Sequence, residues 1–184
     1  MVLIIVMYFT GFLDNKQVIA VKKGQSIEFT DKRPDMNDTD IFLCVPAAFS
    51  TSKGGIIGHY STGKGREGKT DKNYTTIHLN NNTYFQQASL VKNHQPKFFK
   101  DRNHNFRRAL CKKDSQFFII HSKLPITLTE FSKQLIDYDN AWNLDMGSYS
   151  YGWYRDSKGK VNHLGLSTFF NKEKQTNWIV IKYK

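Results

Sequence analysis

The stretch NAWNLDMGS, residues 140–148, joins a short apolar run to a carboxylate. The run from Ala141 to Leu144 predicts a buried strand. Asp145 then stands at the end of that strand, and Gly147 permits a sharp turn or the close approach of a ligand. Asp145 therefore has two interpretations. It is either a capping residue at a strand end or a functional carboxylate at a sheet edge, where ligands often bind.

The segment before this stretch predicts a helix. Thr127-Leu-Thr-Glu130 has the form of a capping box, in which the threonine and the glutamate each satisfy a backbone N–H at the start of the helix. Leu128, Phe131 and Leu135 follow at helical spacing, so one face of this helix can pack against a sheet.

The rest of the chain is typical of strands separated by turns. We expect strands at residues 2–9, 18–22, 27–30, 41–45, 75–79, 83–85, 117–121 and 178–183. The strand at 41–45 is wholly apolar, which suits the middle of a sheet. Neither a repeat nor a linker interrupts the 184 residues. The sequence therefore predicts a single α+β domain over residues 1–184, rich in strand, with a mixed twisted sheet and one or a few packed helices.

The net charge of +11 invites a nucleic-acid interpretation. However, the lysines are scattered along the chain and form no long run of like charges, which disfavours a nucleic-acid partner. A basic nucleic-acid binder remains an alternative, and its affinity would fall steeply with salt. The apolar run at residues 1–9 lacks a basic start and is too short to span a membrane, so we expect a strand there and no membrane span.

The two cysteines and the histidines show no metal-ligand spacing, so no metal or other cofactor is expected. Cys44 and Cys111 both lie in apolar surroundings and form either one disulfide or two buried thiols. Residues 63–70 match the spacing G-x-x-x-x-G-K-T of a phosphate-binding loop, but no apolar helix pattern follows them. They predict a hairpin loop and not a nucleotide site.

Three segments resemble motifs of the phosphodiester glycosidase family. They are Arg107-Arg-Ala-Leu-Cys111, Ile126-Thr-Leu-Thr-Glu-Phe131 and residues 141–148, which together with their spacing cover roughly a quarter of the chain. In that family an Arg-Thr-Ala-Ile-Gly segment leads into a strand, a Leu-Thr-Leu-x-Glu helix follows, and a strand ends in Ala-x-Asn-Leu-Asp-Gly-Gly-Gly-Ser. Here Met146 replaces the first glycine of that turn, and Pro46 stands where an upstream asparagine is usual.

The resemblance implies a hydrolase that cleaves a sugar from a phosphodiester-linked or related glycoconjugate, with a carbohydrate or sugar-phosphate as ligand. It also suggests a secreted, periplasmic or cell-surface location. Asp145 would be the acid/base or nucleophilic carboxylate, and Arg107 would bind phosphate. The residues expected to bind substrate are Arg108, Asn143, Gly147, Ser148 and Tyr151.

Two alternatives remain open at this site. The replacements at Pro46 and Met146 leave room for a carbohydrate- or phosphate-binding module on the same fold that no longer catalyses. Tyr149, Tyr151 and Trp153 alternate as on one face of a strand, but aromatic rings of this kind also suit stacking on a sugar. The sequence specifies neither the sugar nor the oligomeric state.

Overall fold

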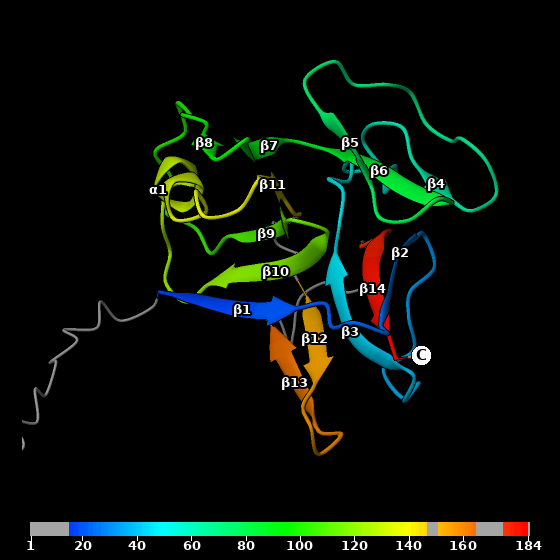
Figure 1. Cartoon of the computed structure of the whole chain (residues 1–184). Helices are drawn as coiled ribbons and strands as arrows, with labels where there is room; N and C mark the ends of the chain where they lie inside the picture. The colour runs from blue at the N-terminus through cyan, green and yellow to red at the C-terminus, as the bar shows by residue number, and fades with distance from the viewer. Residues whose placement is uncertain (1–14, 147–150, 165–174, 184) are drawn as a thin grey trace, which may run out of the picture.

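The computed structural model describes residues 15–146, 151–164 and 175–183 (Figure 1). Within these ranges the chain forms three sheets and one short helix. The expected strand at 2–9, the turn residues Gly147 and Ser148, and Tyr149 lie outside the described residues. Most of the other expected strands appear within one or two residues of their predicted bounds.

The largest sheet has six strands and carries the segment that ends at Asp145. Its spatial order is β1-β10-β9-β11-β7-β8. The strands are β1 (Lys16–Ala20), β7 (Ser89–Lys92), β8 (Gln95–Pro96), β9 (Arg108–Lys113), β10 (Gln116–Ser122) and β11 (Asn140–Asn143).

A five-stranded sheet has the order β13-β12-β3-β14-β2, and a three-stranded sheet has the order β4-β6-β5. Their strands are β2 (Ser26–Thr30), β3 (Ile41–Pro46), β4 (Ser61–Thr62), β5 (Thr75–His78), β6 (Thr83–Gln87), β12 (Gly152–Arg155), β13 (Val161–Leu164) and β14 (Trp178–Lys182). The apolar strand β3 occupies the middle of its sheet, which confirms that expectation. The C-terminal strand β14 lies beside it.

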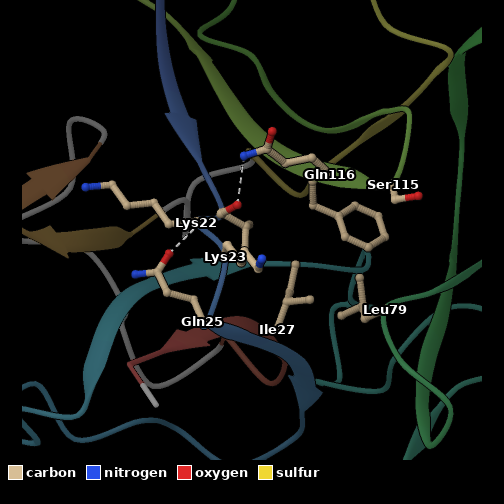
Figure 2. Close-up of a pocket in the computed structure, with 10 residues that line it drawn as sticks. Lys22, Lys23, Gln25, Ile27, Leu79, Ser115 and Gln116 are labelled. Carbon is tan, nitrogen blue, oxygen red and sulfur yellow. Dashed lines mark hydrogen bonds between the residues drawn. The ribbon is translucent and has the colours of Figure 1, made fainter.

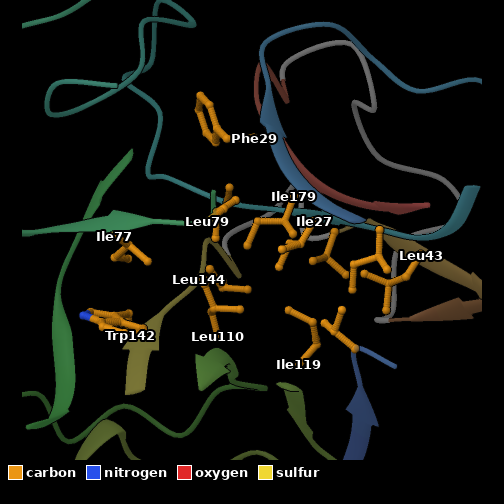
Figure 3. Close-up of a cluster of buried hydrophobic side chains, with 14 of the residues drawn as sticks. Ile27, Phe29, Leu43, Ile77, Leu79, Leu110, Ile119, Trp142, Leu144 and Ile179 are labelled. Carbon is orange, nitrogen blue, oxygen red and sulfur yellow. The ribbon is translucent and has the colours of Figure 1, made fainter. Parts of the chain in front are cut away.

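The main core lies between the six-stranded and five-stranded sheets. Leu110 and Ile119 of the first sheet belong to the same buried cluster as Leu43 and Ile179 of the second (Figure 3). Alternate residues of β9 and β10 point to the other face of the six-stranded sheet, because side chains alternate along a strand. On that face lies the predicted helix (Figure 1). Its Phe131 is fully buried in one cluster with Ala109 and Ile120.

The predicted helix is confirmed as α1 (Leu128–Lys133), and its capping box is present. The Thr127 Oγ1 accepts a hydrogen bond from the Glu130 backbone N–H at 3.2 Å, and the Glu130 carboxylate accepts one from the Thr127 backbone N–H at 2.9 Å. These contacts satisfy two backbone donors that a helix start otherwise leaves without partners.

The expected mixed α+β architecture is corrected in part. The fold is strand-rich, but it is mostly β, and every pairing between the described strands is antiparallel. A parallel pair needs a crossover connection of a dozen or more residues, usually a helix. In the described part of the chain the helix has six residues, and short turns join four of the antiparallel pairs, namely β5–β6, β7–β8, β9–β10 and β12–β13.

The structure also decides the alternative left open above for the two cysteines. Cys44 and Cys111 are both buried free thiols in different clusters, and burial raises the pKa of each well above its ordinary value.

Residues 63–70 form a loop between β4 and β5, as expected. An antiparallel backbone β-bridge between Tyr60 and Glu67 holds the loop, and the next element after it is the strand β5. Among the described residues no helix is long and apolar enough to cross a membrane.

Candidate functional site

Asp145 lies where the two large sheets meet. The Leu144 backbone N–H still donates to the Arg108 carbonyl on β9 at 2.9 Å, but the next backbone N–H, that of Asp145, donates to the Ala47 carbonyl at 3.0 Å. Ala47 directly follows β3 of the other sheet. The chain therefore passes from one sheet to the other at Asp145, and the carboxylate stands at their junction.

The turn after β3 is braced by buried amides. The Asn177 side chain is fully buried, accepts from the Ala48 N–H at 2.7 Å and donates to the Ala48 carbonyl at 3.1 Å. Gln87 donates to the Ala47 carbonyl at 3.4 Å. Pro46, which stands where the resemblance leads one to expect an asparagine, is the last residue of β3, and amides from elsewhere in the chain hold the backbone just after it.

Arg108 is a fully buried cation that makes one long side-chain hydrogen bond within the described structure. Its exposed fraction is 0%, and its Nη2 donates to the Leu164 carbonyl at a long 3.4 Å. Its Nε and Nη1 find no partner among the described residues. Burial lowers the pKa of its guanidinium from 12.5 to about 10, and the electrostatic influence of Cys44 and Asp145 partly offsets that effect. The guanidinium is therefore charged at neutral pH.

Gly152 on β12 leaves the space in which Arg108 sits. A Cβ at this position would lie 3.3 Å from the Arg108 Nη1 and 2.9 Å from the Val45 Cγ1. Real Cβ atoms are not found that close to a neighbouring carbon, so only glycine lets β12 approach β3 and the guanidinium at this point.

Arg107 and Arg108 face opposite sides of the six-stranded sheet, as consecutive residues on an extended chain do. The Arg107 Nε donates to the Ile126 carbonyl at 3.1 Å, and its Nη2 donates to the Asn103 carbonyl at 2.7 Å. These partners belong to the loops on the helix side. The structure thus brings Arg108 to Asp145, whose charge acts on it, and places the Arg107 guanidinium elsewhere.

The structure does not gather the other expected site residues around Arg108 and Asp145. Asn143 is opposite Ala109 in the strand register, on the helix side of the sheet, and its buried Oδ1 has no partner among the described residues. Tyr151 packs with Trp153 in a separate cluster, and its hydroxyl lies 3.1 Å from the His163 Nδ1. Gly147 and Ser148 lie outside the described residues.

His121 is a residue at the site that the sequence analysis missed. It stands opposite Arg108 in the pairing of β10 with β9, and only 8% of it is exposed. Its Nδ1 is buried without a partner in the described structure, and its ring stacks on Phe106 with centroids 6.2 Å apart. Burial and then the Arg108 charge lower its pKa from 6.5 to about 4, so the ring is neutral at neutral pH. The available signal was a polar residue ending the apolar strand 117–121, the same pattern that singles out Asp145.

A separate hollow of about 500 Å³ opens between the β1–β2 turn and the β9–β10 turn (Figure 2). Lys22, Lys23, Gln25 and Gln116 line its rim, and the Gln116 amide donates to the Val21 carbonyl at 3.0 Å. Among the described residues its lining includes neither a carboxylate nor a histidine, and its only titratable side chains there are those of Lys22 and Lys23. In the described parts of the chain there is also no group of three or more residues suited to hold a metal ion.

The fold is similar to that of known proteins, although the sequence is not. No family model matches the chain, and no curated protein matches it by sequence. The catalytic domain of zebrafish N-acetylglucosamine-1-phosphodiester alpha-N-acetylglucosaminidase, auto-inhibited by its pro-peptide, matches with a TM-score of 0.61 and 9% identity, over 92% of this chain and 83% of that one. A hypothetical protein from Synechocystis matches with a TM-score of 0.58 and 9% identity, over 92% of this chain and 59% of that one. At such low identity the likeness shows a shared fold alone.

Proposed function

We propose that the protein is a hydrolase that cleaves a sugar from a phosphodiester-linked glycoconjugate, with Arg108 as the phosphate-binding residue. The observation that carries the proposal is the buried, charged Arg108, of which two N–H-bearing nitrogens have no partner among the described residues. Leaving buried donors unpaired costs about 1–3 kcal/mol each, so such a group calls for an explanation other than stability. The structural likeness to a phosphodiester glycosidase catalytic domain supports this choice of substrate.

The chemistry follows from the two charges at the sheet junction. A guanidinium whose Nε and Nη1 have no partner in the described structure offers charge-assisted hydrogen bonds to the oxygens of a phosphodiester. The Asp145 carboxylate is close enough to act electrostatically on Arg108, so a phosphate held there would bring the glycosidic bond beside it. In this role Asp145 serves either as general acid/base, acting on the leaving oxygen or on the attacking water, or as nucleophile at the anomeric carbon of the sugar.

Binding of an anion requires a local opening, because Arg108 has no exposed surface. The long 3.4 Å hydrogen bond to the Leu164 carbonyl is the contact that an incoming phosphate oxygen would replace. Arg107, which satisfies the carbonyls of Ile126 and Asn103, has no part in this proposal. Gly147 and Ser148, which lie outside the described residues, remain candidates for shaping the sugar pocket, whereas Asn143 lies on the helix side of the sheet with Ala109.

A non-catalytic sugar-phosphate-binding module is the second candidate. The observation that favours it is the pair of replacements at Pro46 and Met146, next to the carboxylate and to the turn that contacts it. Such a module would use Arg108 in the same way but would release the ligand unchanged.

Hydrolysis of methyl N-acetylglucosamine-1-phosphate tests the proposal. We expect turnover by the wild-type protein, a loss of about 100-fold or more in kcat for Asp145→Asn, and a similar loss in kcat/KM for Arg108→Met. Arg107→Gln is the matched control and should stay within a few-fold of wild type. Equal turnover by the wild-type protein and Asp145→Asn contradicts the catalytic assignment. Ligand binding that depends on Arg108 but gives no turnover supports the module instead.

A further inference from the structure

His121 and Arg108 form a pair of buried polar side chains on one face of the six-stranded sheet. They are directly opposite each other in the register of β10 and β9, a position that brings side chains close together. Each presents a buried nitrogen without a partner in the described structure, Nδ1 on His121 and Nε and Nη1 on Arg108. Nothing in the proposed hydrolysis so far uses the histidine.

We propose that His121 is a second anion-binding residue of this site and takes up a proton when a phosphate-type anion binds beside Arg108. The inference rests on the proposed function, because it assumes that Arg108 receives such an anion. The proton comes from solvent and adds to a ring nitrogen, so no other bond forms or breaks. The imidazolium then donates a charge-assisted hydrogen bond to the anion.

The charges around the ring explain why an anion would drive this uptake. On β9 the facing group is Arg108, and on β1 it is the uncharged Gln17, which is opposite His121 on the other side. Phe106 stacks on the ring and carries no charge. At the junction of the two large sheets, Cys44 and Asp145 are the other titratable groups that influence Arg108 electrostatically, and both raise its pKa. The ring is held neutral by burial and by one neighbouring cation, and a bound anion offsets both effects.

The expected coupling has a definite size and sign. The pKa of free His121 is about 4, and its ordinary value is 6.5. If the bound anion restores the ordinary value, affinity rises about 30-fold between about pH 8 and about pH 5. At about pH 5.5 the protein should take up close to one proton for each anion bound, because the ring is then protonated only in the complex.

Calorimetric titration with dimethyl phosphate tests the proposal, since the charge of this anion is constant across the range. Titrations at about pH 5.5 in two buffers of different ionisation enthalpy count the protons taken up. We expect nearly one proton for the wild-type protein and for His78→Gln, a matched control on the exposed face of β5. His121→Gln should bind with little proton uptake and with an affinity that barely changes with pH.

The outcomes separate this inference from the proposed function. Binding that needs Arg108 but takes up no proton, or proton uptake that persists in His121→Gln, overturns the role of His121 and leaves the hydrolase proposal standing. Absence of any Arg108-dependent binding overturns both. If His121→Gln does not fold, the ring signals of His121 in the wild-type protein provide the same test. Its pKa must rise when dimethyl phosphate is added, and an unchanged pKa refutes the proposal.

Discussion

Replacing Arg108 by methionine should stabilise the protein while it abolishes anion binding. A buried charge that serves stability is paired and hydrogen-bonded, whereas Arg108 has one long hydrogen bond to the Leu164 carbonyl and two nitrogens without partners in the described structure. Methionine fills a similar volume with an unbranched, flexible and uncharged side chain. The substitution therefore removes an uncompensated charge without leaving a large cavity.

The size of the gain follows from the pKa of the guanidinium. Burial lowers this pKa from 12.5 to about 10, which corresponds to about 3 kcal/mol against the charged form in the folded state. A basic group whose pKa falls on folding opposes folding at every pH below its folded pKa, so the full penalty applies at neutral pH. After subtraction of one weak hydrogen bond and some packing, we expect Arg108→Met to raise the free energy of unfolding by about 2 kcal/mol.

Urea denaturation at neutral pH, followed by circular dichroism, measures this change. The matched control is Arg155→Met. Arg155 is also buried, but it donates to the carbonyls of Ile41 and Gly159 at 3.2 Å and also to those of Met36 and Asp38. Its loss leaves these acceptors unpaired and should lower stability by about 2–4 kcal/mol. If Arg108→Met is destabilised as strongly as Arg155→Met, then Arg108 is a structural residue and the argument for a functional cation is wrong.

Four further predictions follow from single contacts. Thr127→Ala removes the capping oxygen that accepts the Glu130 N–H and should cost about 1 kcal/mol in urea denaturation; no change would show that the capping box is not formed in solution. Gly152→Ala places a Cβ 2.9 Å from the Val45 Cγ1 and should cost about 1–3 kcal/mol by the same measurement, unless β12 shifts freely. His121 has a pKa of about 4 in the folded protein and an ordinary value of 6.5, so the unfolded chain binds a proton there first as the pH falls. The free energy of unfolding should therefore be unaffected by His121 above about pH 6.5 and should fall by about 2 kcal/mol from pH 7 to pH 5. Urea denaturation at both pH values should show a loss that is smaller by this amount in His121→Gln. Cys44 and Cys111 should react with a thiol reagent only after unfolding, and fast labelling of the native protein would contradict their burial.

Local patterns were enough to predict most elements of this fold. The apolar run at 41–45 became the central strand β3, and the expected strands at 75–79 and 83–85 became β5 and β6. The capping box of Thr127 and Glu130 is formed as predicted. These features depend on side-chain chemistry over a few neighbouring residues, so the sequence reveals them directly.

The sheet arrangement was harder to predict, because strand partners lie far apart in the chain. The C-terminal strand β14 inserts between β3 and β2, and β11 pairs with both β9 and β7. The expectation of a mixed sheet failed for this reason. Nothing in a strand's own residues states the direction of its neighbour.

The candidate site shows the same division. The sequence by itself determined that a carboxylate, Asp145, ends an apolar strand and that two arginines, Arg107 and Arg108, precede another. Only the tertiary structure decided which arginine belongs with the carboxylate, because a shift of one residue along a strand moves a side chain to the opposite face of the sheet. It also decided that His121 stands beside Arg108, since strand register, and not sequence proximity, makes them neighbours. Burial between two packed sheets then set the charge state of both groups, and burial is a property of the assembled fold alone.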